Sequence, residues 1–245
     1  TALLYCGYVG GSASDYGRGI AVDAAGNAYL AGYTSSTEQT FPAAVGPELT
    51  HNGGVDAFVA KVNGAGTALL YCGYVGGSGT DRSYGVAVDT AGRAHLTGYT
   101  SSTEQTFPVV VGPDLTHNGG DDAFLASVNA AGTGLDACGY LGGSGSDGSY
   151  GIAVDTAGNA YLSGYTNSSE QTFPVTVGPD LSYNGTDDAF VAKVNGAGTA
   201  LLYCGYVGGS GADYGGYGMA VDAAGNAYLT GYTSSTEQTF PVGVG

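Results

Sequence analysis

The sequence predicts an all-β fold, a β-propeller-type array of four-stranded antiparallel blades. Apolar residues alternate with period two in short segments, which is the pattern of half-buried strands. Between these segments lie polar turn residues and many of the chain's 47 glycines. The pattern repeats about every 66 residues, a spacing shown by the four cysteines at Cys6, Cys72, Cys138 and Cys204. Four short antiparallel strands per repeat are typical of a propeller blade.

Each repeat begins with a predicted hairpin of two strands, A and B. In the second copy strand A is expected at residues 85–89 and strand B at residues 94–100. An Asp-x-x-Gly turn joins them, because Asp bonds the backbone two residues on and Gly accepts a positive φ. We expect strand A to be innermost, since its alanines are small enough for a crowded axis. These alanines are Ala21, Ala87, Ala153 and Ala220.

A connection of about twenty residues, 101–121, follows strand B and contains a Phe-Pro pair. Strand C is expected at residues 122–128, and an Asn-x-x-Gly turn leads to strand D at residues 135–141. The phenylalanines of strand C, Phe58, Phe124 and Phe190, should be buried between blades. The whole chain is then one repeat array, with strand D at 1–11, repeats at 18–83, 84–149 and 150–216, and a partial repeat at 217–245.

The fourth blade is expected to be incomplete, because its strand B at residues 227–233 has no strand C beside it. Such an unpaired edge would expose backbone donors and acceptors. A longer parent array or a neighbouring copy of the chain should fill it. The absence of an initiator Met and of a signal peptide before residue 1 predicts a mature or excised segment.

The charge of the chain excludes several partners. A formal net charge of −16, with only 5 basic residues, argues against nucleic acid and against an anionic membrane surface. No apolar run approaches the roughly 20 residues of a membrane helix, so no membrane insertion is expected. The same charge suits a soluble surface or cation binding.

Three motifs resemble those of a known family. They are Tyr-Val-Gly-Gly-Ser-Gly-x-Asp, then Tyr-Gly-x-Ala-Val-Asp-x-Ala-Gly-Asn-Ala-Tyr-Leu-x-Gly-Tyr-Thr-Ser-Ser-Thr, and finally Phe-Pro with Asp-Ala-Phe-Val-Ala-Lys-Val-Asn. Together they resemble the bacterial SBBP (beta-propeller) repeat over essentially the whole chain. The resemblance implies a propeller in exported or surface proteins of bacteria and archaea. It implies no particular activity.

The cysteines occupy one equivalent position in strand D. Equivalent residues of neighbouring blades lie beyond the Cα separation of roughly 7 Å that a disulfide permits. We therefore expect no disulfide among them and interpret them as small buried hydrophobes, with intermolecular disulfides as the alternative.

Calcium is the one metal for which the sequence offers ligands, although no EF-hand spacing exists. Two equivalent loops bring Asp and Asn together, against the alternative that these residues only form turns. The candidates are Asn118, Asp121 and Asp122, and Asn184, Asp187 and Asp188. No other cofactor is predicted.

No enzyme is predicted. His51 and His117 align with Tyr183, and His95 aligns with Tyr29, which favours packing aromatics over a catalytic base. One glutamate recurs per repeat without an asymmetric partner, unlike the single site of most enzymes. The tyrosines around the cysteines could stack on sugars, or pack between blades with the hydroxyl at the surface. They are Tyr5, Tyr71, Tyr203, Tyr8, Tyr74, Tyr140 and Tyr206.

From these observations we expect a non-enzymatic extracellular or cell-surface structural protein. It would be a subunit or segment of a filament or adhesive scaffold, with self-association or a longer parent array. The alternative is a carbohydrate- or calcium-binding propeller module with one site per blade, whose partner would be a glycan or Ca²⁺.

Overall fold

The computed structural model describes residues 3–242 and confirms the all-β fold. These residues form fourteen strands and no helix. The strands make three four-stranded antiparallel sheets and one two-stranded sheet, and each sheet is one blade. In every full blade, strands that follow one another in sequence are also neighbours in the sheet. This is the predicted A-B-C-D order.

The strands of the first two blades are β1 Asp15–Val22, β2 Ala28–Thr34, β3 Asp56–Val62, β4 Leu69–Val75, β5 Asp81–Val88, β6 Ala94–Thr100, β7 Asp122–Val128 and β8 Leu135–Leu141. Those of the third and fourth blades are β9 Asp147–Val154, β10 Ala160–Thr166, β11 Asp188–Val194, β12 Leu201–Val207, β13 Asp213–Val221 and β14 Ala227–Thr233.

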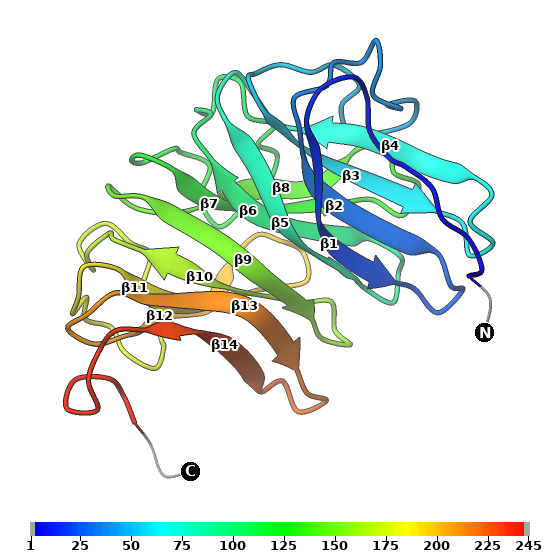
Figure 1. Ribbon diagram of the computed structural model, residues 1–245. Coiled ribbons are helices and arrows are strands. Elements are labelled where there is room, and N and C mark those ends of the chain that lie inside the picture. The colour runs from blue at the N-terminus through cyan, green and yellow to red at the C-terminus, as the bar shows by residue number, and fades with distance from the viewer. Residues whose placement is uncertain (1–2, 243–245) are drawn as a thin grey trace.

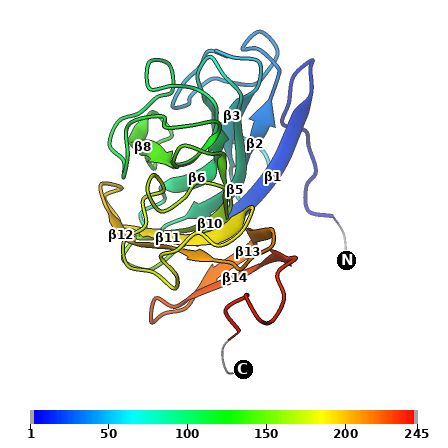
Figure 2. The same ribbon diagram turned by 90° about the vertical axis from the view of Figure 1, so that its left-hand side faces the viewer.

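The blades fan around the row of strands β1, β5, β9 and β13, which lie side by side (Figure 1). A Cβ atom on Gly85 of β5 would lie 2.9 Å from the backbone oxygen of Tyr150 in β9. Only glycine permits this approach of two backbones. Strand A is therefore innermost, as predicted. The four blades form an open arc, with successive sheets turned relative to one another (Figure 2).

Strand A differs from its predicted bounds. It begins at Asp81 in the second blade, four residues before the expected start. A β-bulge interrupts its pairing with β6 between Ser83 and Gly85. The bulge breaks the period-two alternation on which the prediction relied. The repeat boundaries drawn at residues 84, 150 and 217 consequently fall inside β5, β9 and β13.

The predicted strand D at residues 1–11 is wrong for the part that the structure describes. Residues 3–11 form no strand, and Tyr8 and Leu4 are exposed. In the full blades strand D pairs with strand C of the same blade, and among the described strands none pairs with residues 3–11. Residues 1–2 lie outside the described part. The described residues thus contain four A, four B, three C and three D strands.

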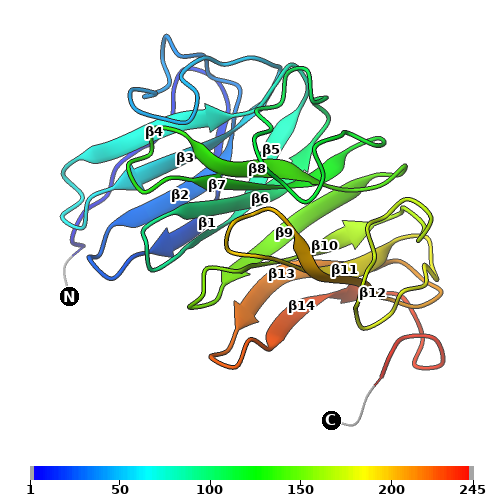
Figure 3. The ribbon, with the colours of Figure 1, turned by 180° about the vertical axis from the view of Figure 1, so that it is seen from behind.

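The long connection between strands B and C covers the outer edge of strand D. The Cys138 backbone N–H donates to Val111 O at 2.8 Å, and the Tyr140 N–H donates to Asp114 O at 2.8 Å. Equivalent bonds reach β4 and β12, which are seen from behind in Figure 3. Covering an edge in this way prevents lateral pairing with another sheet. By contrast, among the described strands β14 pairs only with β13.

The core lies between blades, as expected for the phenylalanines of strand C. Phe124 is 0% exposed and belongs to a cluster with Val59 and Val75 of the first blade. Phe107, from the Phe-Pro pair, packs edge-on against it with ring centroids 5.5 Å apart. Phe190 is buried in the same way against Leu125 and Leu141 of the second blade. Phe58 is also buried, but it packs on Phe41 and Tyr74 of its own blade and on Val9, so the prediction that it lies between blades is wrong.

The cysteines are free, which confirms the prediction that they form no disulfide with one another. Cys72, Cys138 and Cys204 are buried in the outer strands, as small hydrophobes. Cys6 is exposed, because residues 3–11 are not part of a blade.

Candidate functional site

An aspartate organises the turn between strands A and B of every blade. Asp23 Oδ1 accepts the backbone N–H of Ala25 and of Asn27, each at 2.9 Å. Asp23 Oδ2 accepts the Asn27 side-chain amide at 2.8 Å and the Tyr29 hydroxyl at 3.1 Å. Gly26 takes a φ of +83°, as the turn requires. Asp155 and Asp222 make the equivalent bonds, which confirms the predicted turn chemistry.

A lysine of strand C completes this arrangement in the first and third blades. Lys193 lies 3.4 Å from Asp155 Oδ2 and 4.6 Å from the centroid of the Tyr161 ring. Burial alone would raise the pKa of Asp155. Its bonds to Asn159, Tyr161 and Lys193 outweigh that effect and lower the pKa to about 2. The carboxylate is thus charged and fully engaged in holding the turn.

The tyrosine of this turn also joins successive blades. Tyr29 OH lies 3.3 Å from Gly92 O in the second blade, and Tyr161 OH lies 3.2 Å from Gly225 O in the fourth. The aspartate turn is therefore part of the junction between blades.

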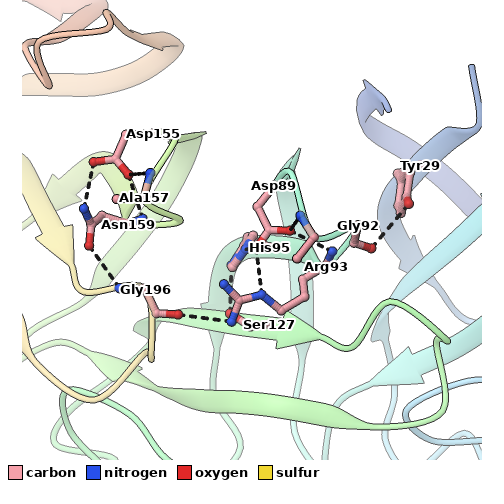
Figure 4. A network of polar contacts seen from close by, with 11 residues as sticks. Tyr29, Asp89, Gly92, Arg93, His95, Ser127, Asp155, Ala157, Asn159 and Gly196 are labelled. Carbon is pink, nitrogen blue, oxygen red and sulfur yellow. Dashed lines mark hydrogen bonds and ion pairs between the residues drawn. The ribbon is translucent and has the colours of Figure 1, made fainter. Parts of the chain in front are cut away.

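The second blade carries a different set of side chains at the same place (Figure 4). His95 stands where other blades have tyrosine, Ser127 where they have lysine, and Arg93 where they have asparagine. Arg93 Nε lies 2.7 Å from Asp89 Oδ2 and supplies the positive charge that lysine supplies elsewhere. Its NH1 donates to Gly196 O of the third blade at 3.1 Å. Arg93 thus makes the contact between blades that tyrosine makes at the other junctions.

The same blade places Ser127, His95 and Asp89 in contact. His95 Nδ1 lies 2.8 Å from Ser127 Oγ, and Nε2 lies 3.2 Å from Asp89 Oδ2. Ser-His-Asp is the set used in acyl transfer, but there the serine must reach a substrate. Ser127 is only 3% exposed and His95 only 2%. Burial lowers the pKa of His95, against the effect of Asp89. We interpret the three residues as a structural substitute for the lysine–tyrosine–aspartate set.

Sequence reasoning placed His95 with Tyr29 but missed this network. The signal was available, because three departures from the repeat, at Arg93, His95 and Ser127, fall in one blade. Their mutual contact depends on the pairing of β6 with β7, where His95 lies opposite Ser127.

A second cluster of acidic groups lies where strand C of one blade meets strand A of the next. Asp122 and Asp147 are both 0% exposed. Asp122 Oδ2 accepts the Asn118 N–H at 2.8 Å, whereas its Oδ1 has no hydrogen-bond partner. Burial raises the pKa of Asp122 to about 6, and Asp147 acts in the same direction. The first and third junctions have the equivalent pairs Asp56 with Asp81, and Asp188 with Asp213.

Several of the calcium candidates form hydrogen bonds within their loops or to a neighbouring tyrosine. Asn118 and Asp122 are joined by the hydrogen bond just described, and Asn184 N–H donates to Asp188 Oδ2 at 2.9 Å. Asp187 accepts the Tyr214 hydroxyl. Asp121 and Asp187 are only partly buried, beside the buried Asp122 and Asp188. Within residues 3–242, no group of three or more His, Cys, Asp or Glu side chains is arranged to hold a metal ion. A calcium site therefore stays a prediction from the sequence.

The other candidate aromatics are packing residues. The ring of His117 lies 5.7 Å from that of Tyr140, and Tyr183 takes the equivalent place against Tyr206 at 5.9 Å. Tyr140 is 0% exposed and its hydroxyl donates to Ser102 O at 2.9 Å. Tyr74 and Tyr206 are placed alike. Among the tyrosines near the cysteines, only Tyr5, Tyr8 and Tyr203 have more than a small exposed part.

Residues 3–242 contain no helix, and so none with the length and hydrophobicity of a membrane span. The chain has no match among curated proteins.

The sequence model of the SBBP beta-propeller repeat matches the chain four times, at residues 5–38, 73–104, 140–170 and 205–237. From the second match onward each begins in strand D and runs through strands A and B of the next blade. The matches cover more than half of the chain and agree with its blades of four antiparallel strands. The chain therefore belongs to the SBBP beta-propeller repeat family.

Proposed function

We propose that this chain is a non-enzymatic structural and assembly module of an exported or cell-surface protein. The observation that carries the proposal is the repetition of one junction between blades. Its aspartate turn, buried aspartate pair and phenylalanine core recur along the array. The aspartates of the turns and of the buried pairs are part of these junctions. The exported location rests on the family and on the composition, which has 21 acidic and only 5 basic residues.

The sheets have covered edges at strand D and an exposed edge at β14. This difference supports assembly in which a further blade is added after the fourth, and not pairing between the outer edges of two arrays. The connections cover the outer edge of β4, β8 and β12, whereas β14 is largely exposed and, within residues 3–242, pairs only with β13. A cavity of about 440 Å³ lies between β14 and the third blade, lined in part by Val191, Val207 and Leu229.

The preceding junctions indicate what fits this cavity. Val191 and Val207 correspond to Val59 and Val75 of the first blade, which Phe124 of the second blade covers. The open surface of the third and fourth blades therefore fits a hairpin of strands C and D from a further repeat. A longer parent chain would supply it directly. A neighbouring copy would make a head-to-tail contact, which propagates into a filament when it does not close.

A peptide of residues 188–207, which holds strands C and D, tests this surface. We expect it to bind the 245-residue chain, to raise its melting temperature and to protect the amides of β14 from exchange. A peptide with Phe190→Asp is the control and should not bind. Light scattering at micromolar concentration and electron microscopy distinguish the two sources, since only copy-to-copy assembly gives oligomers of the isolated chain. A compact monomer with protected β14 amides and no peptide binding would overturn the proposal.

A further inference from the structure

The bulges of strand A bring a line of side chains to the inner surface of the array. In β5 the bulged residue is Tyr84, which is left out of the pairing with β6. A bulge costs one residue of ladder pairing and redirects a side chain. It recurs in every blade: Arg18, Tyr84 and Tyr150 are left out of the pairing in the first three blades, and Gly216 and Tyr217 in the fourth.

These rings touch one another from blade to blade. The Tyr84 and Tyr150 centroids are 5.0 Å apart, and those of Tyr150 and Tyr217 are 6.3 Å apart. A tyrosine of the neighbouring strand flanks Tyr84 and Tyr150, namely Tyr99 with its centroid at 5.9 Å and Tyr165 with its centroid at 5.8 Å. We call this set the tyrosine stripe: Tyr16, Tyr33, Tyr84, Tyr99, Tyr150, Tyr165, Tyr214, Tyr217 and Tyr232.

The tyrosine stripe is a surface and not a core. Tyr217 is 69% exposed, Tyr232 54% and Tyr16 47%, and most of the other rings are half-buried. The one tyrosine of strand D in the second blade, Tyr140, is by contrast 0% exposed. An aromatic surface of this extent, interrupted by hydroxyls, is suited to a partner with both apolar faces and polar groups.

The charged groups along the tyrosine stripe differ between its two ends. Arg18 and Arg82 lie over rings of the first two blades, with Arg82 4.9 Å from the Tyr33 centroid. Toward the other end are carboxylates. Asp187 accepts the Tyr214 hydroxyl at 3.0 Å. Asp121 lies near Tyr165 and adds to the rise in its pKa, which is caused mainly by burial. Both aspartates are partly open to solvent.

We propose that the tyrosine stripe binds a neutral, linear polysaccharide. Sugar rings present C–H faces that pack on aromatic rings, and their hydroxyls can donate to Asp121 and Asp187 and accept from Arg82. A proline-rich peptide also suits aromatic grooves. Proline has no backbone N–H, however, so such a peptide would leave these carboxylates without donors. The net charge of −16 disfavours anionic polysaccharides. This binding activity does not depend on assembly of the array.

The test uses the full chain and the linear neutral hexasaccharides cellohexaose, laminarihexaose and maltohexaose. The chain has no tryptophan, so its tyrosine fluorescence can be followed, and nine of its 20 tyrosines lie in the stripe. We expect saturable binding of at least one hexasaccharide by fluorescence and calorimetry. Tyr217→Ser and Tyr232→Ser, both at exposed positions, should each weaken it by about tenfold. The matched control is Tyr228→Ser, because Tyr228 is 58% exposed on the same β14 but lies outside the stripe. It should leave binding unchanged.

Two further probes test the chemistry of the partner. Oligogalacturonate, an anionic sugar chain, should bind more weakly than the neutral hexasaccharides, and deca-proline should not bind. Failure of all three neutral sugars to bind at millimolar concentration would overturn the proposal. So would binding that Tyr217→Ser and Tyr232→Ser leave intact, or tighter binding of deca-proline, which would assign the stripe to peptides. Tyr217 and Tyr232 lie in the fourth blade, on which the 188–207 peptide should dock, so peptide binding is measured on the unsubstituted chain and sugar binding is measured without peptide. Failure of one of these two measurements then leaves the other proposal standing.

Discussion

Phe124 shows how much of the fold depends on one side chain per blade. It is fully buried between the first and second blades and packs on Phe107. Phe124→Ala should lower the free energy of unfolding by about 3 to 5 kcal/mol, because the blades cannot collapse into the cavity it leaves. Urea denaturation measures this loss. Tyr8→Ala, at a fully exposed position, should change stability by less than about 0.5 kcal/mol. Equal effects of the two substitutions would contradict the core assignment.

The buried aspartates at the junctions make stability depend on pH. Asp122 has a pKa of about 6 in the folded protein, through burial and the neighbouring Asp147 and Asp114, with His117 and the Asn118 N–H acting against them. An unfolded aspartate has a pKa near 3.9. The folded state thus binds this proton more tightly. Its contribution to stability is fully present below about pH 4 and is lost as pH rises through 6. Asp56 and Asp188 behave in the same way.

We therefore expect a higher melting temperature at pH 5 than at pH 7.5. Below about pH 3.5 stability should fall. Asp155 has a pKa of about 2 in the folded protein but near 3.9 when unfolded, so protons bind the unfolded state more tightly and favour it as the pH falls. Asp122→Asn removes the charge and should stabilise the protein by about 1 to 2 kcal/mol at pH 7.5 while flattening the pH profile. Calorimetry across the pH range tests this. Destabilisation by Asp122→Asn at pH 7.5 would show that the ionised carboxylate is needed.

At the scale of the element, the bulge of strand A requires a glycine opposite it. A Cβ atom on Gly164 would lie 1.8 Å from Gly148 O and 2.7 Å from Ser149 Cα. Gly164→Ala should therefore cost more than about 3 kcal/mol, because backbone must move. Gly54→Ala is the control, since no atom lies within 4 Å of its Cβ position. Chemical denaturation of the two variants compares them, and a mild effect of Gly164→Ala would argue against the bulge geometry.

Strand D shows that one sequence can have two structures within this chain. Residues 3–9 and residues 201–207 are both Leu-Leu-Tyr-Cys-Gly-Tyr-Val. Residues 201–207 form a strand paired with strand C, as do residues 69–75 with the same sequence, whereas residues 3–9 form no strand and pair with none among the described residues. Under native conditions Cys6 should react with a thiol reagent at once. Cys204 should react only on unfolding, because burial raises its pKa to about 12 and blocks access. Mass spectrometry of labelled peptides distinguishes them, and labelling of Cys204 as fast as Cys6 would refute this.

At the scale of the whole molecule, the array is nearly one-dimensional, since each blade packs on its neighbours in sequence. Such arrays open from their ends. Native-state hydrogen exchange should be slowest in the central strands β6 and β7 and at least about tenfold faster in β14. Exchange that is uniform over all blades would show that the array unfolds as one cooperative unit.

Much of this molecule follows from the sequence by itself. The 66-residue spacing, the Asp-x-x-Gly turns and the phenylalanines of strand C determined the blades, their strand order and the interior of the junctions. Each of these signals is local, because a turn residue or an alternating pattern acts on its own few neighbours.

What only the tertiary structure decided depends on contacts between segments distant in sequence. Residues 3–11 look like strand D but have no partner strand. The connections between strands B and C fold back and form hydrogen bonds with strand D. Ser127 contacts His95 only because β7 pairs with β6. The tyrosine stripe arises because a bulge in each blade turns one side chain toward the next blade. Register, bulges and the approach of one blade to another are non-local, so no pattern within a single repeat reveals them.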